Sequence, residues 1–300
     1  MTPSSPSGTC PCLTIRGGTV LPLQRRVHVM GVVNVTPDSF SDGGHYFQCE
    51  DAVRHAMALV EQGADLLDIG AESSRPGADP VDEQEELRRL LPVVRDLVKR
   101  TTVPISIDTT KAAVAEQALD VGASLINDIS ALQFDPRMAQ VVARSGAGVV
   151  LMHMQGSPKT MQQRPFYANV VDDVHAFLAE RLAVAMQAGI EREKIIIDPG
   201  IGFGKKIEHN LKLLAHLDAL ASLGRPILAG VSRKGFIGSI VDRPVEGRLM
   251  GTAAAVAVAI MKGARMVRVH DVAPMLDVIS MVEAIVRHQQ PASVHNQPAT

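Results

Sequence analysis

The sequence predicts an α/β fold, a (β/α)8 or TIM barrel in which parallel strands alternate with helices. Three observations lead to this fold class. Eight short apolar runs are each followed by a polar residue, a loop and a helical pattern. No stretch between 13 and 289 has the composition of a linker. Barrels of this kind reach about 250 residues as one domain. A doubly wound open sheet is the alternative fold.

The two ends of the chain are expected to lie outside the barrel. Residues 1–12 and 290–300 are polar and contain prolines, which predicts disordered tails. We therefore expect a single domain over 13–289. Within it, residues 13–21 alternate around a Gly-Gly pair, a pattern typical of a β-hairpin, and we expect this hairpin to cap the bottom of the barrel.

The barrel elements then follow in alternation. The apolar runs predict strands at 27–33, 65–69, 104–107, 124–127, 148–153, 194–197, 226–231 and 266–270. The patterns between them predict helices at 51–62, 82–100, 111–121, 136–144, 170–188, 208–223, 247–262 and 273–288. In such a barrel the carboxyl ends of the strands meet at one mouth, and sites are built there from the loops.

Composition excludes several classes of function. A net charge of -2 gives no electrostatic footprint for nucleic acid. The longest run of small apolar residues, 250–261, is too short to span a bilayer and predicts a buried helix. The cysteines, Cys10, Cys12 and Cys49, form neither a disulfide framework nor a metal-ligand spacing. No signal-peptide pattern begins the sequence. We therefore expect a cytoplasmic protein without nucleic-acid or membrane partners.

The most distinctive stretch is Asp198-Pro-Gly-Ile-Gly-Phe-Gly-Lys-Lys206, which follows the apolar run 195–197. Its three glycines let the backbone adopt positive φ and approach a bound group closely. The pattern places a carboxylate, Asp198, at the end of a strand and beneath a glycine-rich loop. A plain tight turn is the structural alternative.

Carboxylate and amide groups also end two other predicted strands. Asp108 ends the third strand, and Asn127-Asp128 ends the fourth. Because buried carboxylates repel one another, we expect a group rich in N–H donors to lie between them and Asp198. A heterocycle with an amidine-like edge fits this description. A metal ion is one alternative, and for Asp108 the role of N-cap to the next helix is another.

Cationic groups are expected in another half of the same mouth. Ser73-Ser74-Arg75 follows the second strand, and a guanidinium beside hydroxyls suits an anion, although a surface pair of Arg75 with Glu72 is the alternative. The seventh and eighth strands end in further donors, Arg233, Lys234, Arg268 and His270. This half suits a polyanion such as pyrophosphate. A Schiff base at Lys234 is disfavoured, because nothing around it suggests a carbonyl substrate.

The loop after the first strand is expected to act as a lid. It runs over 34–44, whereas a βα connection usually has roughly 2–6 residues. Asn34 lies at its base and the aromatic Phe40 at its tip. A turn-rich surface loop is the alternative; a mobile lid that closes over a bound group is the functional interpretation.

Taken together, these motifs closely resemble the dihydropteroate synthase family. The matching stretches occur in the family's order over roughly 15–288, and they are MGVVNVTPDSFSDGG (30–44), DIGAESSRPGA (68–78), ISIDTTK (105–111), INDI (126–129), LMHMQGSPKTMQ (151–162), DPGIGFGK (198–205), GVSRKGFIG (230–238) and VRVHDV (267–272). The resemblance implies a transferase that joins 4-aminobenzoate to 7,8-dihydropterin-6-ylmethyl diphosphate, with Mg2+ as cofactor. The products would be 7,8-dihydropteroate and diphosphate.

The resemblance also implies roles for individual residues. The pterin would be held by Asp108, Asn127, Asp198 and Lys234, with Met152 packed near its ring. Asn34 would lie beside the Mg2+ and the diphosphate. The anion would be bound by Ser74, Arg75, Arg268 and His270. The 4-aminobenzoate pocket, beneath lids at 34–44 and 72–78, would be shaped by Phe40, Ser74, Pro76, Phe203 and Lys234. Catalysis would fall chiefly to Asp108, Asp198, Lys234 and Arg75.

The sequence departs from the family pattern in two places. The family's second loop usually reads Gly-Glu-Ser-Thr-Arg-Pro, whereas this chain has Ala71 and Ser74 at the first and fourth positions. Many members have serine after the Ser-Arg-Lys triplet, whereas this chain has Gly235. Both changes lie on the 4-aminobenzoate side, where sulfonamides also bind, so we expect sulfonamide sensitivity to be affected and pterin binding to be retained.

The resemblance leaves two alternative functions to consider, and it also implies an oligomeric state. A pterin-binding paralogue without synthase activity would be expected to have lost an anion-binding residue, and none is lost here. A barrel that transfers a methyl group from methyltetrahydrofolate to a corrinoid protein would not need Arg75, Ser74 or the first lid. The family forms homodimers, and the helix over 250–261 is a candidate contact, although packing against the barrel explains its composition equally well.

Overall fold

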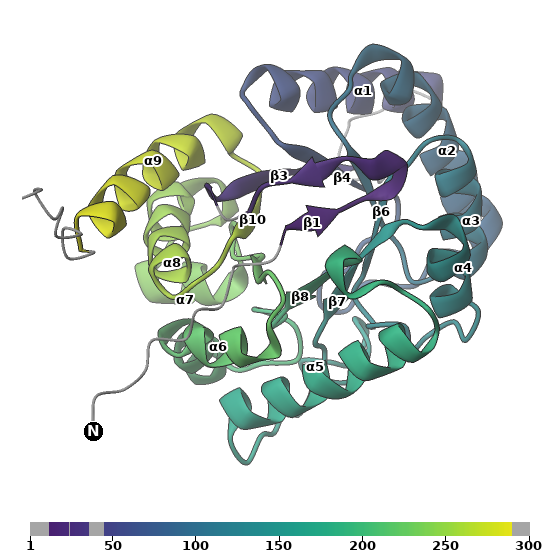
Figure 1. Cartoon of the computed structure of the whole chain (residues 1–300). Helices are drawn as coiled ribbons and strands as arrows, with labels where there is room; N and C mark the ends of the chain where they lie inside the picture. The colour runs from purple at the N-terminus through teal and green to yellow at the C-terminus, as the bar shows by residue number, and fades with distance from the viewer. Residues whose placement is uncertain (1–11, 24, 36–44, 290–300) are drawn as a thin grey trace, which may run out of the picture.

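The computed structural model describes residues 12–23, 25–35 and 45–289, and in this part of the chain one parallel sheet forms the centre of the molecule (Figure 1). Its strands, in chain order, are β3 (His28–Asn34), β4 (Leu66–Gly70), β5 (Ile105–Asp108), β6 (Leu125–Asp128), β7 (Gly148–Met152), β8 (Ile195–Asp198), β9 (Leu228–Ala229) and β10 (Met266–Val269). Each pairs with its neighbour in sequence, and β10 pairs with β3. A parallel bridge between Ile197 and Ile227 joins β8 to β9 and closes the ring. The predicted (β/α)8 barrel is confirmed.

A short hairpin closes the bottom of this barrel. β1 (Leu13–Thr14) pairs antiparallel with β2 (Val20–Leu21), across a 3-10 turn, η1 (Arg16–Gly18). Its apolar side chains form one buried cluster with residues near the starts of the strands, namely Met30, Leu66, Leu125, Val150, Ile196, Leu228 and Met266. In Figure 1, β1 accordingly lies across the ring of strands. The predicted cap is therefore present, and apolar burial holds it in place.

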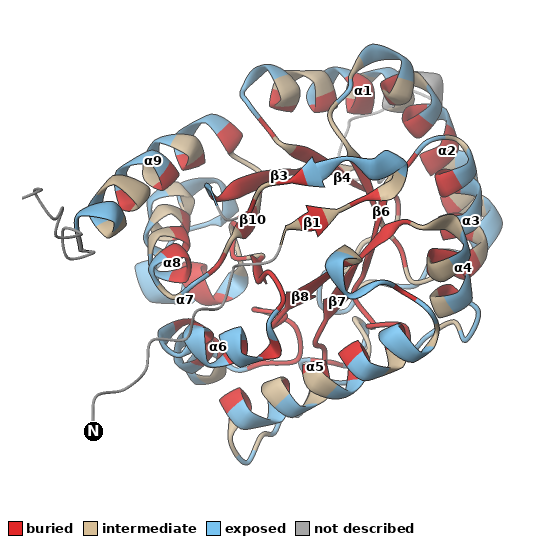
Figure 2. Ribbon diagram, in the orientation of Figure 1, coloured by how far each residue is buried: buried red, intermediate tan, exposed pale blue. Residues whose placement is uncertain are grey.

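Helices surround the barrel and bury only their inner faces (Figure 2). They are α1 (His45–Glu61), α2 (Glu83–Arg100), α3 (Ala112–Asp120), α4 (Met138–Ser145), α5 (Val170–Gln187), α6 (Ile207–Ala215), α7 (Gly235–Val241), α8 (Leu249–Met261) and α9 (Val272–Gln289). Short 3-10 helices add η3 (Arg192–Lys194), η4 (Leu217–Leu223) and η5 (Val245–Gly247). No helix among the described residues is long and apolar enough to cross a membrane.

Four predictions about the helices and strands were wrong in part. The helix expected over 208–223 is interrupted at His216, whose φ of -124° lies outside the helical region, so that α6 and η4 are separate. The strand expected over 226–231 shortens to β9. The helix α7 was not predicted, because glycines and β-branched residues are poor helix formers; burial of Phe236 and Ile237 stabilises it instead. The helix α8 is not buried all round, since Met250 is 78% exposed.

The alternation of side chains along each strand places polar groups in the upper barrel. Leu125 on β6 lies in the bottom cluster, and Asn127, two residues further on, faces the same interior nearer the mouth. In β8, Ile196 and Asp198 repeat the arrangement. The lower interior is therefore an apolar plug, and the polar residues above it form the floor of a pocket.

Candidate active site

An inner pocket lies at the carboxyl ends of the strands. Its lining comes from strands and from the loops that follow them: Asp108, Asn127, Ile129, Met152, Asp198, Gly200, Ile201, Phe203, Gly230, Lys234 and Arg268. All the residues that the sequence led us to expect around the pterin are in this set. The structure also brings Phe203 and Arg268 here, which had been expected around the 4-aminobenzoate and the anion.

The Arg268 side chain links two carboxylates across the barrel. Its Nε donates to Asp68 Oδ2 at 2.6 Å, and its Nη2 donates to Asp108 Oδ2 at 2.8 Å. Asn127 Nδ2 donates to the same Asp68 oxygen at 2.9 Å. The expected division of the mouth into an acidic and a basic half is therefore wrong for Arg268, which is ion-paired within the acidic half.

Asp68 is the site residue that sequence reasoning missed. It lies on β4, is fully buried and has one carboxylate oxygen, Oδ1, without a hydrogen-bond partner. A signal was present, because a carboxylate two residues after the inward-facing Leu66 must also face the barrel interior. Asp68 orients Arg268 and Asn127 from below the pocket.

The two pocket carboxylates are held in a low-dielectric environment. Burial raises the pKa of Asp108 to about 7, although the Arg268 guanidinium opposes this rise. Burial also raises the pKa of Asp198 to about 6, against a hydrogen bond from the Gly200 amide to its Oδ1 at 2.7 Å. Burial lowers the pKa of Lys234 to about 8. These groups are poised for a donor-rich or cationic partner that would stabilise the ionised carboxylates.

Apolar residues form one wall of the same pocket. The Lys234 ammonium lies 4.0 Å from the centre of the Phe203 ring, a cation–π contact. Phe203 packs in a small cluster with Ile129 and three methionines, Met152, Met154 and Met161. A flat ring in the pocket would therefore have polarisable side chains beside it and hydrogen-bonding groups at its edge.

The two carboxylates Asp108 and Asp128 have different surroundings. Helix α3 has Lys111 at its N-cap, so Asp108 is not the cap and remains directed into the pocket. Asp128, in contrast, accepts hydrogen bonds from the Ser130 and Leu132 amides and from the Ser130 hydroxyl. Asp128 therefore orders the turn after β6, and it does not line either of the two cavities described here.

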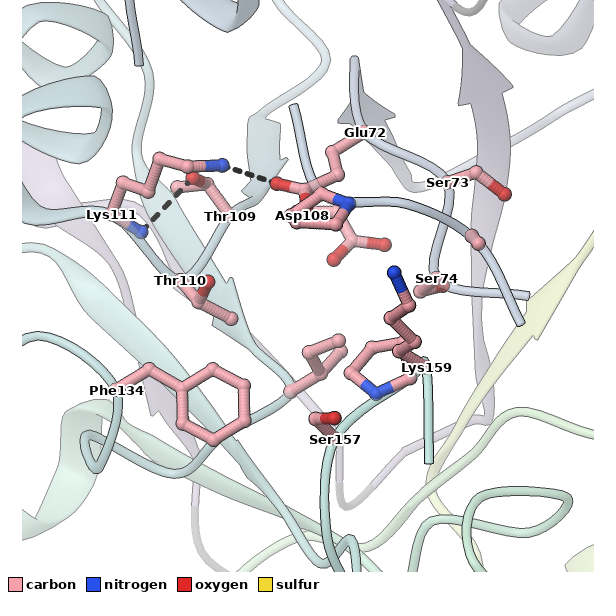
Figure 3. Close-up of a pocket in the computed structure, with 14 residues that line it drawn as sticks. Glu72, Ser73, Ser74, Asp108, Thr109, Thr110, Lys111, Phe134, Ser157 and Lys159 are labelled. Atoms are coloured by element: carbon pink, nitrogen blue, oxygen red, sulfur yellow. Dashed lines mark hydrogen bonds and ion pairs between the residues drawn. The ribbon is translucent and has the colours of Figure 1, made fainter. Parts of the chain in front are cut away.

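An outer cavity of about 290 Å3 adjoins the inner pocket and shares Asp108 and Ile129 with it (Figure 3). Its remaining lining is Glu72, Ser73, Ser74, Ala78, Pro80, Thr109, Thr110, Lys111, Phe134, Ser157, Pro158 and Lys159. Figure 3 shows Lys111 paired with Glu72 on the second loop. The alternative pairing of Arg75 with Glu72 is therefore wrong, because Glu72 is bound by Lys111.

The second loop, which follows β4, contacts the loop that follows β7. The Gly77 amide donates to the Pro158 carbonyl at 3.0 Å, and Lys159 pairs with Asp79 at 2.7 Å. Arg75 and Pro76 are exposed and line neither cavity. Ser74 lines the outer cavity, whereas Phe203 and Lys234 line the inner pocket. The structure thus does not bring the expected 4-aminobenzoate residues into one lining.

The loops after β9 and β10 supply two further predicted groups, Arg233 and His270. His270 Nδ1 is 3.0 Å from the Ser232 hydroxyl, and burial, followed by the charges of Arg268 and Arg233, lowers the pKa of His270 to about 4. The ring is therefore neutral near pH 7. Arg233 makes a bidentate ion pair with Asp271 at 2.6 and 2.9 Å, so its charge is already matched.

The residues present fit a magnesium ion that is held chiefly by a substrate. Asn34 ends β3 at the mouth and is half-buried, which offers one amide oxygen. Among the described residues no group of three histidine, cysteine or acidic side chains could form a cage of protein ligands. Mg2+ is commonly bound by one or two protein oxygens together with phosphate oxygens. The expected lid residue Phe40 and most of the 34–44 loop lie outside the described residues.

Comparisons with known proteins agree with this geometry. Residues 30–270 match the family described as pterin binding enzyme. The chain is 47% identical over 256 residues to the dihydropteroate synthase of Haemophilus influenzae. The aligned region covers 85% of this chain and 93% of that protein. It is also similar to the structure of a Yersinia pestis dihydropteroate synthase in complex with a sulfonamide drug. The TM-score is 0.86 and the identity is 45%, and the match covers 92% of this chain and 99% of that chain.

Two structures of the Xanthomonas albilineans dihydropteroate synthase extend the comparison to ligands. One contains 4-aminobenzoic acid, and it matches with a TM-score of 0.87, 48% identity and coverage of 94% of this chain and 100% of that one. The other contains 7,8-dihydropteroate, with a TM-score of 0.83 and 45% identity over the same shares. Identity at this level over nearly the whole barrel shows the family. The chain belongs to the dihydropteroate synthases, within the pterin-binding enzymes.

Proposed function

We propose that this chain condenses 7,8-dihydropterin-6-ylmethyl diphosphate with 4-aminobenzoate to give 7,8-dihydropteroate and diphosphate. The observation that carries the proposal is the inner pocket, where Asp108, Asn127 and Asp198 meet at the carboxyl ends of three strands. Their oxygens match the N–H donors along one edge of a pterin. A flat ring would lie against Met152 and Phe203, with Lys234 at its other edge.

The same carboxylates support a dissociative substitution. As the C–O bond to the diphosphate breaks, its electron pair leaves with the phosphate oxygen, and positive charge spreads from the methylene carbon into the pterin ring. Asp108 and Asp198 are fixed before the reaction and stabilise that charge in a site of low dielectric. The lone pair of the aniline nitrogen then forms the C–N bond, and one N–H proton is lost. A weakly basic aniline requires no strong general base.

The leaving group needs positive charge and donors outside the pterin pocket. We assign this role to Arg75 on the second loop, with Ser74 and His270 as donors. Asn34 would hold Mg2+, which would supply positive charge to neutralise the departing diphosphate. Arg268 is not assigned to the leaving group, because its ion pairs with Asp68 and Asp108 favour a role in fixing the acids. A steep linear dependence of rate on amine nucleophilicity would count against the dissociative scheme.

Pyrophosphate release by the purified protein tests the function. With the pterin diphosphate and Mg2+, release should depend on 4-aminobenzoate and should collapse in Arg75→Ala. Arg95→Ala, on the exposed face of α2, is the matched control and should behave as wild type. No release by wild type, with pterin binding still detected by calorimetry, would instead identify a pterin-binding paralogue.

We further propose that the protein is a cytoplasmic homodimer that acts only on small molecules. Support for the dimer comes from α7 and α8, which expose Ile240, Val241, Met250, Val258 and Met261. Exposed apolar groups gathered on neighbouring helices favour association. For the cytoplasm the support is that the two cysteines within the described residues, Cys12 and Cys49, are free thiols. Cell fractionation with an antibody to the chain tests the compartment.

A further inference from the structure

Lys205 is a buried cation that the proposed reaction does not use. It lies in the loop between β8 and α6, and the residue is only 3% exposed. Its Nζ lies 2.9 Å from the Gly200 carbonyl oxygen, 3.0 Å from the Phe203 carbonyl oxygen and 2.8 Å from His153 Nδ1. The His153 carbonyl oxygen lies further away, at 3.4 Å, so the three closer acceptors match the three protons of an ammonium group.

Burying this group carries a cost that the loop must offset. Burial lowers the pKa of Lys205 to about 7, with Asp198 opposing the shift. Burial and the nearby Lys205 charge lower the pKa of His153 to about 2, so the imidazole is neutral and its Nδ1 can accept a hydrogen bond from the ammonium. The hydrogen bonds that Lys205 makes in these surroundings offset the cost of burying it.

Both carbonyls that Lys205 binds belong to residues of the pterin pocket. The Gly200 amide donates to Asp198 Oδ1 at 2.7 Å, which fixes one pocket carboxylate. The Phe203 ring lies beneath the Lys234 ammonium. Through these two backbone groups, Lys205 is connected to an acid and to an aromatic wall of the inner pocket, although it does not line that pocket itself.

The loop backbone requires such support from side chains. Gly200, Gly202 and Gly204 have φ values of 66°, 85° and 58°, so the loop is neither strand nor helix and forms no ladder of its own. Other side chains add to this support, and Gln162 Nε2 donates to the Gly202 carbonyl at 3.0 Å. Asn210 Oδ1 accepts from the Gly202 amide at 2.7 Å, and the Tyr167 hydroxyl donates to the Gly204 carbonyl at 2.8 Å.

We propose that Lys205 is a positioning residue, which sets the pterin-contacting face of the 198–206 loop by cross-linking the Gly200 and Phe203 carbonyls to His153. The inference rests on the proposed function, because the pocket it serves is the pterin pocket. It assigns Lys205 no contact with substrate. Loss of the cross-link removes the ammonium donor from both carbonyls and leaves the Gly200 carbonyl with the Phe203 amide alone. Asp198 and Phe203 can then shift, and a displacement of about 1 Å can reduce rates roughly a hundredfold.

The main test replaces Lys205 by methionine, which keeps the length and removes the donors. We expect Lys205→Met to weaken pterin binding, measured by calorimetry without chemistry, roughly tenfold or more. The KM for the pterin diphosphate should rise more than the KM for 4-aminobenzoate. Lys206→Met is the matched control, because the neighbouring side chain is exposed and makes no bond into the loop interior. Unchanged pterin affinity in Lys205→Met, with active wild type, overturns the inference; inactive wild type overturns the proposed function instead.

A second pair of variants separates positioning from packing. Lys205→Gln retains an N–H donor but places a polar amide in the buried site. Lys205→Met has no donor but fills the site with an apolar side chain. Positioning predicts that Lys205→Gln binds pterin better than Lys205→Met, and simple packing predicts the reverse order. If neither variant folds, Tyr167→Phe removes only the hydroxyl bond to the same loop. Its pterin Kd should rise by about threefold to tenfold for the loss of one such bond, and a wild-type Kd would overturn loop positioning by these donors.

Discussion

Arg268 and Asp68 form an ion pair inside the barrel, with 2.6 Å between Nε and Oδ2, although they are 200 residues apart in the chain. Asp68 is completely buried and also accepts from Asn127. The pair therefore fixes a donor on β6 and a cation on β10 from one carboxylate on β4. The floor of the pterin pocket depends on a residue that does not itself line the pocket.

Replacement of that carboxylate should loosen the floor. We expect Asp68→Asn to lower kcat/KM for the pterin diphosphate roughly tenfold to a hundredfold, because Arg268 loses its charged partner and is left to pair with Asp108 alone. Asp277→Asn, exposed on α9, serves as the control. Steady-state kinetics at varied pterin concentration measure the effect. Wild-type kcat/KM in Asp68→Asn would show that Arg268 needs no second carboxylate.

The pH dependence of kcat/KM should be bell-shaped. Burial places the pKa of Asp198 at about 6 and that of Asp108 at about 7, and it lowers that of Lys234 to about 8. The carboxylates accept N–H bonds through both oxygens, and most strongly, when they are ionised. Activity should therefore rise as pH increases through about 6 to 7 and fall as Lys234 loses its proton above about 8. The acidic limb belongs to the interacting pair, not to one acid. In Asp198→Asn the acidic limb should simplify to one step; an unaltered limb would assign it elsewhere.

Gly200→Ala should destabilise the fold as well as the site. At a φ of 66°, a Cβ on residue 200 would lie 1.8 Å from the His153 carbonyl oxygen, which is backbone and cannot move aside. Positive φ alone costs about 1–2 kcal/mol for an alanine. We expect Tm to fall by roughly 4 °C or more on thermal unfolding. Gly235→Ala meets no atom within 4 Å, and because alanine is the better helix former it should not lower Tm. Similar losses in both variants would contradict the clash.

Gly235→Ser tests the departure on the 4-aminobenzoate side. Gly235 is exposed at the start of α7, and an added Cβ meets nothing within 4 Å, so a serine fits without strain. The new hydroxyl should lower the KM for 4-aminobenzoate, by about threefold to tenfold for one hydrogen bond to a carboxylate, and leave that for the pterin unchanged. Sulfonamide inhibition should tighten in parallel. An equal change in both KM values would place the serine away from the 4-aminobenzoate site.

The exposed face of α8 provides a test of the proposed dimer. Met250 and Met261 are 78% and 56% exposed, on a helix rich in alanine and valine. Met250→Glu should shift the protein from dimer to monomer in sedimentation equilibrium, because a charge at an apolar interface loses hydration on association. Met281→Glu, on the exposed side of α9, is the matched control. A wild-type monomer, or a dimer unaffected by Met250→Glu, would remove α8 from the interface.

Much of the barrel follows from local pattern. Most of the strands contain an apolar run such as Ile195–Ile197, buried between the barrel interior and the surrounding helices, and such runs are typical of parallel strands. The polar residue at the end of each run must reach the mouth, since all the strands are parallel. Asp108, Asn127 and Asp198 could therefore be assigned to one pocket from the sequence.

The sequence by itself thus determined the order of the strands, the bottom cap and the acids of the mouth, because side-chain alternation and strand direction are local properties. Tertiary structure decided the rest. It formed α7 against propensity, paired Arg268 with Asp68 and Glu72 with Lys111, and buried Lys205 beneath the glycine loop. Those contacts join residues far apart in sequence, and their energies depend on burial and charge, which only the closed barrel establishes.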